Sequence, residues 1–218
     1  MPAVREFIRS LRVLHRTYRH FPIRERAHVL IRFLTCPFQR VVKHLPEGAT
    51  LLDIGAGHGV FSVLARARGA HPTAVDPDPR KVRRLEGIAS VIGYDDCILG
   101  EFDAVAIIDV LYKMPIGDWD ALLDRVRQRL KRGGILIIKE HDPTARLKHS
   151  INRFQERLAS LLHLTLGEQF NYEPPAQFIR RLQSLGFAVI EAKRIDRGYP
   201  HPHFLFVARL PLLVANER

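Results

Sequence analysis

The chain has 218 residues, of which 46% are hydrophobic and 26% are charged. This composition is typical of a globular chain with a sizeable core, and it excludes disordered, collagen-like and low-complexity proteins. Two cysteines, Cys36 and Cys97, are too few for a disulfide framework, and no apolar run approaches the roughly 20 residues that span a bilayer. The first thirty residues also lack the apolar segment of a signal peptide. We therefore expect a cytoplasmic protein made of one domain with an extension.

The basic charge is concentrated at the N-terminus. Residues 1–45 contain ten basic and two acidic side chains, so +8 of the net charge of +11 lies there. Basic and apolar residues both recur there at three- and four-residue spacing, which predicts a basic amphipathic helix within an extension over residues 1–45. The residues are Arg5, Arg9, Arg12, Arg16 and Arg19 on one side, and Val4, Phe7, Ile8, Leu11, Leu14 and Tyr18 on the other. A second helix is predicted over Arg24–Leu34, before Pro37.

Two interpretations of the first helix stay open. In one, its apolar side packs on the body of the protein and its arginines face solvent. In the other, the helix meets an anionic surface, either the headgroups of a membrane or a nucleic acid. The planar guanidinium group of arginine binds phosphates and carboxylates through two hydrogen bonds at once. That preference favours an anionic partner, so a peripheral position at a membrane is part of the expectation.

Residues 50–76 predict a βαβ unit. An apolar strand, Thr50–Ile54, leads into the turn Gly55-Ala56-Gly57-His58-Gly59, a helical pattern follows, and the next strand ends at Asp76. Glycines let a backbone approach a ligand closely, and the first turn of a helix presents free N–H groups. Asp76 follows Gly59 by seventeen residues, about where such folds place a ribose-binding carboxylate. An adenosine-containing cofactor is predicted, whereas the glycine spacing departs from that of a nicotinamide dinucleotide site.

Further motifs follow in an order that narrows the class. They are Leu52 to Gly59, with Asp53 two positions before the first glycine, then Ala74-Val75-Asp76-Pro77, Glu101 to Tyr112, and Leu130 to Lys139. Together they resemble the class I S-adenosylmethionine-dependent methyltransferases over roughly residues 49–210. The resemblance implies an α/β fold with a Rossmann-like, seven-stranded, mostly parallel sheet, an antiparallel last strand and helices on both faces. A methyltransferase domain would then cover residues 46–218, with a helical lid inserted at about 140–175.

The resemblance also implies where S-adenosylmethionine binds. The glycine turn would surround its methionine end, Asp53 would fix that turn and the ammonium group, and Asp76 would bind the ribose. An acid near the adenine amine, Asp95 or Asp96, is as consistent with an ordinary turn. The expected cofactor-binding residues are Asp53, Gly55, Ala56, Gly57, Gly59, Asp76, Pro77, Asp95, Asp109 and Val110. The product would be S-adenosylhomocysteine.

Polar residues end the predicted fourth and fifth strands, where doubly wound sheets bind their ligands. Asp109 and Tyr112 follow the fourth strand, and His141 follows the fifth. We expect His141 to act as the general base, oriented by Asp142 or Glu140, because an ordinary histidine pKa near 6.5 suits that task. Asp109, Tyr112 and His141 form the predicted catalytic set. In the alternative interpretation, His141 only begins the following helical segment. No metal is expected, because histidines at strand ends are more often structural.

Three functions stay in competition. The preferred one is methyl transfer to oxygen or nitrogen of a small or lipid-like amphiphilic acceptor, with leucine and phenylalanine residues of the lid enclosing it. The first alternative is an RNA methyltransferase, for which the net charge is suitable. Lys43, Asp109 and Lys139 fill three places of the Lys-Asp-Lys-Glu set of the 2′-O-methylating enzymes, but His203 stands at the fourth. The second alternative is a non-catalytic binding protein that retains the fold. The oligomeric state is not predicted.

Overall fold

The computed structural model describes residues 2–82, 85, 89–93, 100–144 and 171–212. Its contacts divide the chain into two compact units, Met1–Leu99 and Gly100–Arg218. Residues 145–170, the larger part of the predicted helical lid, and the acids at 95 and 96 lie outside the described residues. Within the described part, no helix is both long enough and apolar enough to cross a membrane.

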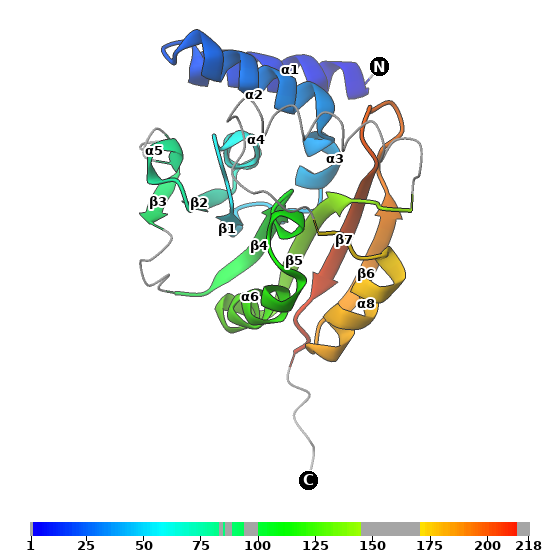
Figure 1. Ribbon diagram of the computed structural model, residues 1–218. Helices are drawn as coiled ribbons and strands as arrows, with labels where there is room; N and C mark the ends of the chain where they lie inside the picture. Colours follow the sequence, from blue (N-terminus) through cyan, green and yellow to red (C-terminus); the bar gives the residue numbers. More distant parts are fainter. Residues whose placement is uncertain (1, 83–84, 86–88, 94–99, 145–170, 213–218) are drawn as a thin grey trace. The chain divides into compact units, whose positions relative to one another are not determined.

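The first unit contains three parallel strands, and β2 lies between the other two (Figure 1). In the register of these pairs, Leu52 of β1 lies opposite Thr73 of β2, and Ala74 of β2 lies opposite Val91 of β3. The predicted βαβ unit is therefore confirmed. The elements of this unit are α1 (Pro2–Tyr18), α2 (Ile23–Thr35), α3 (Phe38–Val42), β1 (Thr50–Ile54), α4 (Val60–Arg66), β2 (His71–Asp76), α5 (Pro79–Val82) and β3 (Ser90–Gly93).

The predicted amphipathic helix is α1, and it packs on α4. Leu14 and Tyr18 are buried, and the Tyr18 hydroxyl donates a hydrogen bond of 2.5 Å to the carbonyl of His58. Val4 and Ile8, which the pattern assigned to the packed side, are instead 62% and 42% exposed, because the fully buried contacts of α1 are in its C-terminal half. The second helix begins one residue earlier and ends one residue later than predicted. The short helix α3 was not predicted.

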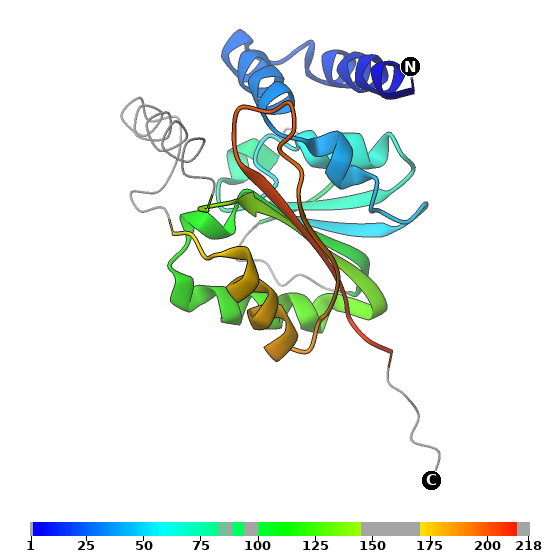
Figure 2. The same ribbon diagram turned by 90° about the vertical axis from the view of Figure 1, so that its right-hand side faces the viewer.

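The second unit has four strands in the order β4-β5-β7-β6. β4 and β5 are parallel, and β7 is antiparallel to both of its neighbours, as expected for the last strand. Trp119 of α6 packs edge-on against Phe178 of α8, with ring centroids 5.8 Å apart, so the two helices lie side by side (Figure 2). The elements are β4 (Phe102–Ile108), η2 (Leu111–Lys113), α6 (Ile116–Arg129), β5 (Leu130–His141), α8 (Pro175–Ser184), β6 (Ala188–Arg194) and β7 (His203–Arg209).

The turn before α4 generates the first testable prediction. Gly59 has a φ of +74°, and a Cβ at this position would overlap the buried Leu85 side chain. Gly59→Ala should therefore lower the free energy of unfolding by at least about 2 kcal/mol, from backbone strain and displacement of a packed side chain. Gly57→Ala is the matched control, because its φ of +56° brings strain but a Cβ there meets nothing within 4 Å. It should cost only about 1 kcal/mol.

Urea unfolding of the two variants without cofactor measures this difference. An equal loss of stability in both variants would show that contact with Leu85 does not constrain the turn.

Candidate active site

Three left-handed glycines shape the turn between β1 and α4. Gly55, Gly57 and Gly59 have φ values of +70°, +56° and +74°, which side chains other than glycine rarely adopt. The backbone N–H groups of Gly55 and Ala56 donate to the carbonyl of Val75, at 2.7 and 3.0 Å. The turn is thereby attached to β2. Space is open beside Gly57, where an added Cβ would meet nothing within 4 Å, so the turn fits a ligand that approaches the backbone closely.

Asp76, the predicted ribose-binding residue, is 8% exposed at the end of β2. Its Oδ2 accepts a hydrogen bond of 2.8 Å from the Gly57 N–H, and its Oδ1 accepts one of 2.9 Å from the Asp78 N–H. The carboxylate therefore holds the glycine turn against the second strand. Each oxygen of a carboxylate has a further lone pair, so these bonds are compatible with ribose hydroxyls as additional donors.

Asp53 lies near the end of β1, and only 1% of its surface is exposed. Its Oδ2 accepts a hydrogen bond of 2.5 Å from the Ser62 hydroxyl of α4. Burial raises the pKa of Asp53 to about 7, and the nearby charge of Asp76 adds to the effect, whereas the Ser62 bond opposes it. Near neutral pH this carboxyl is therefore close to the midpoint of its titration, and a cation placed beside it would favour the ionised form.

In the second unit, the ends of β4 and β5 are joined by a buried ion pair. The Lys139 ammonium contacts Asp109 Oδ1, and the exposed fractions of the two side chains are 0% and 1%. Asp109 has a φ of +58°, and its N–H donates to the Lys139 carbonyl at 2.9 Å. His141 Nε2 lies 3.3 Å from the same carboxylate oxygen. The structure thus brings Asp109 and His141 of the predicted catalytic set together with Lys139, and Tyr112, the third member, stacks on His141.

Glu140 lies between Lys139 and His141 on β5. We expected it to orient His141 as an alternative to Asp142, but its carboxyl instead contacts backbone N–H groups. Its Oε1 accepts hydrogen bonds from the N–H groups of Val110 and Leu111, at 3.0 and 2.8 Å. Its buried Oε2 has no hydrogen-bond partner in the described part of the chain. Burial, with a further contribution from the charge of Asp109, raises the pKa of Glu140 to about 8. The side chain is therefore mainly protonated at pH 7.

His141 belongs to a stack of rings. Tyr112 lies 5.1 Å away with a 13° angle between the ring planes, and His201 lies 5.9 Å away with a 12° angle. Tyr172 stacks on Tyr112 at 5.8 Å. Burial, followed by the charge of Lys139, lowers the pKa of His141 to about 4, well below the value of 6.5 that we expected from the sequence. The imidazole is therefore neutral at pH 7.

Asp142 does not orient His141, which corrects one of the sequence expectations. Its Oδ2 accepts a hydrogen bond of 2.7 Å from Arg194, and its Oδ1 accepts bonds from the N–H and hydroxyl of Thr144. The reason is that Asp142, just past the end of β5, has its two carboxylate oxygens bound by Arg194 and Thr144. Asp109, from the neighbouring strand end, is the carboxylate near His141.

A narrow aromatic slot opens beside Glu140 and His141. Its volume is about 20 Å³, which is room for about one water molecule. Aromatic and other side chains of α6, α8, β5, β7 and the segment before α8 form its walls. The lining residues are Tyr112, Trp119, Glu140, His141, Asn171, Tyr172, Glu173, Pro175, Phe178, Phe204 and Phe206. Asn171 fixes one wall, because its N–H donates to the Tyr112 carbonyl at 2.7 Å.

Among the described residues, Asp109, His141 and His203 each offer one ligand atom within 4.8 Å of the others. Two imidazoles and one carboxylate are a donor set that transition metals accept. The Lys139 ammonium already contacts Asp109 in this cluster, however, and a buried cation beside it opposes the binding of another. The expectation that the protein uses no metal stays a prediction.

Comparison with known proteins identifies the class. The fold matches that of the Haloferax volcanii methyltransferase solved in complex with the Trm112 activator, with a TM-score of 0.68, 15% identity, and coverage of 93% of this chain and 100% of that one. It also matches magnesium protoporphyrin IX methyltransferase of Synechocystis PCC 6803 with bound S-adenosylhomocysteine, with a TM-score of 0.61, 18% identity, and coverage of 91% and 93%. At these identities the likeness shows the fold, which is the Rossmann-like α/β methyltransferase fold with a mostly parallel sheet.

A family model described as "Methyltransferase domain" matches residues 23–192, so the chain belongs to this family of enzymes. Ubiquinone biosynthesis O-methyltransferase of Xylella fastidiosa (strain 9a5c) is 37% identical over 111 residues, which are 45% of this chain and 44% of that protein. The protein of the same name from Xanthomonas axonopodis pv. citri is 29% identical over 153 residues, 65% and 63% of the two chains. The chain therefore spans less than two thirds of either relative.

These matches confirm the predicted methyltransferase class. The predicted cofactor, S-adenosylmethionine, agrees with them, since two of the similar structures contain S-adenosylhomocysteine. The individual cofactor-binding and catalytic assignments stay predictions. In the structure, Asp53, the glycine turn and Asp76 lie together in the first unit, whereas Asp109 and Val110 belong to the second. Pro77 is exposed beside Asp76.

The contacts of Asp76 generate the second prediction. Asp76→Ala removes a charged acceptor for ribose hydroxyls and also the bond from Gly57 that holds the turn, so S-adenosylhomocysteine should bind about 10- to 100-fold more weakly. Calorimetric titration measures the affinity directly. Asp78→Ala is the control, because Asp78 is a neighbouring acid whose carboxylate pairs with Arg80 near the surface. Affinity unchanged by Asp76→Ala would show that another group binds the ribose.

Proposed function

We propose that the protein transfers the methyl group of S-adenosylmethionine to a hydroxyl oxygen of a small aromatic or lipid-like acceptor. The observation that carries this proposal is the buried cluster at the ends of β4 and β5, where a neutral imidazole lies 3.3 Å from a carboxylate. A hydroxyl acceptor must lose its proton as it is methylated, and a neutral imidazole supported by a carboxylate can take that proton. The similarity to ubiquinone biosynthesis O-methyltransferases supports oxygen as the attacked atom.

In the first unit, the residues fit the cofactor, which supplies the methyl group as a sulfonium. The open space beside Gly57 suits the close approach of the methionine end, and Asp76 suits the ribose. Asp53, with a pKa raised to about 7, is ready to ionise beside an ammonium group. These assignments follow the order of the motifs along the chain and the bonds that fix the turn.

In the second unit, His141 would receive the proton. Its Nε2 faces Asp109, so that an N–H at this position donates toward the carboxylate and Nδ1 is the atom that accepts the proton. Asp109 stabilises the resulting imidazolium, while burial and the charge of Lys139 destabilise it. The proton is thus held weakly and is readily released afterwards. Tyr112, stacked on the imidazole, fixes the plane of the ring.

The finer features of the fold are part of the same proposal. They are a continuous seven-stranded sheet, a domain beginning at residue 46 and a lid over about 140–175. The family model itself matches from residue 23, within the predicted extension. The RNA alternative receives less support from the residues of its candidate set. Lys139 is fully buried against Asp109, and Lys43 pairs with Glu6 at 3.2 Å.

The third prediction tests the role of His141. His141→Ala should lower turnover with a simple catechol as acceptor by about 100-fold, because the proton acceptor is lost, while the affinity for S-adenosylhomocysteine is unchanged. His71→Ala is the matched control, since His71 is an exposed histidine of the first unit, and it should retain full turnover. Transfer of a radiolabelled methyl group measures the rate. Equal turnover in the two variants would exclude His141 as the base.

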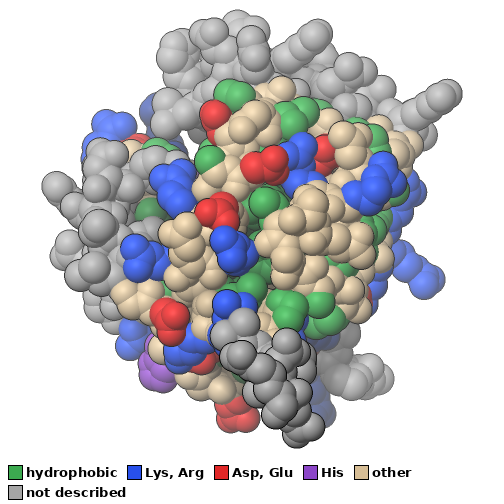
Figure 3. All heavy atoms as spheres, turned by 90° about the horizontal axis from the view of Figure 1, so that it is seen from below, with side chains coloured by type: hydrophobic (Ala, Val, Ile, Leu, Met, Phe, Trp, Pro, Cys, Tyr) green, Lys and Arg blue, Asp and Glu red, His purple; other side chains and the backbone are tan. Residues whose placement is uncertain are grey.

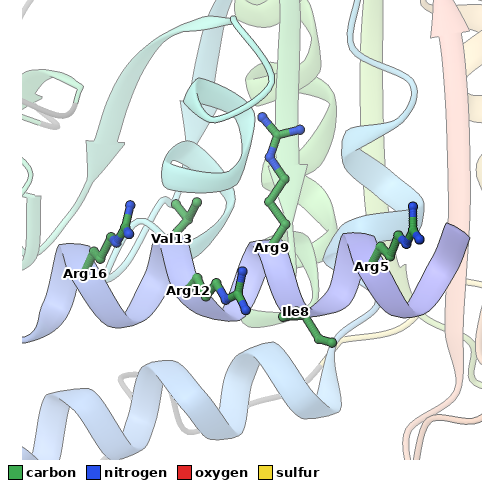
Figure 4. Close-up of a pocket in the computed structure, with 6 residues that line it drawn as sticks. All are labelled: Arg5, Ile8, Arg9, Arg12, Val13 and Arg16. Atoms are coloured by element: carbon green, nitrogen blue, oxygen red, sulfur yellow. The ribbon is translucent and has the colours of Figure 1, made fainter.

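A second element of the proposal is attachment to an anionic membrane surface. Arg5, Arg9, Arg12 and Arg16 are exposed along α1 and line a shallow groove together with Ile8 and Val13 (Figure 4). Six of the nine large apolar side chains that are exposed in the described residues belong to α1 and α2. They are Val4, Ile8, Ile23, Leu30, Ile31 and Leu34. Apolar groups beside arginines are the combination that binds headgroups and enters the acyl boundary.

The four residues of α2 recur at helical spacing, so they form one apolar strip on that helix. By contrast, the face seen in Figure 3 mixes acidic, basic and apolar side chains. The gathered arginines and the exposed apolar strip therefore support a lipid surface as the partner of the first two helices, and a membrane is also where a lipid-like acceptor would be found.

The fourth prediction concerns this surface. The protein should sediment with vesicles that contain phosphatidylglycerol, less with neutral vesicles, and should be released as salt screens the charges. Replacing Arg5, Arg9, Arg12 and Arg16 by Gln should abolish sedimentation and leave cofactor binding intact. The control replaces four exposed arginines of the second unit, Arg125, Arg132, Arg180 and Arg209, and changes net charge equally. An equal loss of sedimentation in both variants would mean that net charge alone causes the binding. If the unaltered protein fails to sediment with either kind of vesicle, the proposal is contradicted.

A further inference from the structure

The N-terminal helices contact the glycine turn directly. The hydroxyl of Tyr18, the last residue of α1, donates a hydrogen bond of 2.5 Å to the carbonyl of His58 in that turn. The ring of His28 from α2 lies 4.7 Å from the ring of His58, with an angle of 46° between the ring planes. Both α1 and α2 also contact α4, the helix that follows the turn. The backbone and the side chain of one turn residue are thus each in contact with a different N-terminal helix.

The surroundings of Tyr18 keep its hydroxyl protonated and its ring in place. The side chain is 2% exposed, and the ring of Phe21 packs edge-on against it, with the ring centroids 5.0 Å apart. Burial raises the pKa of the Tyr18 hydroxyl above its ordinary value, and the charge of Asp53 adds to the effect. The hydroxyl is therefore a hydrogen-bond donor throughout the physiological pH range.

The bond from Tyr18 fixes the peptide group between His58 and Gly59. The carbonyl of this group accepts the bond from Tyr18, and its N–H donates to the carbonyl of Ala56 at 2.8 Å. Glycine adopts φ angles of either sign at little cost, so a peptide group next to Gly59 rotates easily unless such bonds oppose the rotation. By contrast, β2 holds the first three residues of the turn, through Val75 and Asp76. Tyr18 therefore holds the part of the turn that leads into α4.

We propose that Tyr18 is a positioning residue of the cofactor site, whose bond to the His58 carbonyl keeps the glycine turn in the conformation that accepts the amino-acid end of S-adenosylmethionine. The inference rests on the proposed function for placing that end of the cofactor at the turn. A turn that is fixed before binding loses less conformational freedom on binding, so the affinity is higher. A turn that is competent for only part of the time binds more weakly by that fraction. The predicted extension over residues 1–45 would thus contribute to the cofactor site.

Tyr18→Phe tests this role, because it removes only the hydroxyl and the ring can remain packed against Phe21. Two ligands separate an effect on the turn from a general effect on the fold. S-adenosylhomocysteine carries the amino-acid end, whereas 5′-methylthioadenosine keeps the adenosine and the sulfur but lacks that end. In calorimetric titrations of the full chain at neutral pH, the variant should bind S-adenosylhomocysteine about five- to tenfold more weakly and 5′-methylthioadenosine to within about twofold of the unaltered protein.

Glu6→Ala is the matched control for a general loosening of α1. The carboxylate of Glu6 pairs with Arg68 at 2.8 Å and with Lys43 at 3.2 Å, and Glu6 lies roughly 18 Å before Tyr18 along the helix. This variant weakens the attachment of α1 without removing a bond to the turn. Its affinities for both ligands should therefore equal those of the unaltered protein.

Several results would overturn the proposal. They are an unchanged affinity of Tyr18→Phe for S-adenosylhomocysteine, equal losses of affinity for the two ligands in that variant, and an equal loss of S-adenosylhomocysteine affinity in Glu6→Ala. The absence of S-adenosylhomocysteine binding to the unaltered protein would overturn it as well. The expected pattern of binding in a protein that methylates no phenol would instead contradict the proposed function alone.

Discussion

The ion pair between Lys139 and Asp109 is the interaction on which the proposed acceptor site depends. Both side chains are almost completely buried, and removing two charges from water is costly unless each satisfies the other. Asp109 also adopts a left-handed backbone conformation and donates its N–H to the Lys139 carbonyl. Side chain and backbone together therefore fix the end of β4 against β5. The start of η2 and the adjacent residues of β5 are positioned as a result.

The two charges of this ion pair shift the pKa values of Glu140 and His141 in opposite directions. The negative charge of Asp109 helps to raise the pKa of Glu140, and the positive charge of Lys139 helps to lower that of His141. Burial is the larger cause in both cases and acts in the same direction as the charge named. At pH 7 the site therefore combines one internal ion pair with a neutral acid and a neutral base.

The sequence predicts those features that depend on local pattern. The glycine turn, the strand that ends at Asp76 and the helix with Arg5 to Arg16 all follow from spacing and residue type, and all are confirmed in the structure. Asp109 and His141 were predicted from their places after two strands, because parallel strands end at one edge of a sheet. The distance of 3.3 Å between His141 Nε2 and Asp109 Oδ1 confirms that the two residues lie together, whereas their catalytic roles stay predictions.

The features of the site that the sequence does not predict depend on contacts between distant segments of the chain. The pairing of Asp142 with Arg194, fifty-two residues away, removes it from His141, and no local pattern indicates that partner. The half-satisfied carboxyl of Glu140 arises only when η2 is folded against β5. The pKa of His141 depends on how completely its neighbours cover it. The sequence indicates Glu140 as an acid beside His141, but not its bonds to the start of η2, which join residues 29 and 30 positions apart.

The most direct test of this account is a double-mutant cycle on the central ion pair, measured by urea unfolding of Lys139→Met, Asp109→Asn and the double variant. Each single substitution leaves a buried group without its partner and should lower the free energy of unfolding by about 3 to 5 kcal/mol. The double variant should be more stable than the sum of the two losses predicts, by at least about 1 kcal/mol. Losses that add to within about 0.5 kcal/mol would show that the two residues do not depend on each other, and would contradict the account.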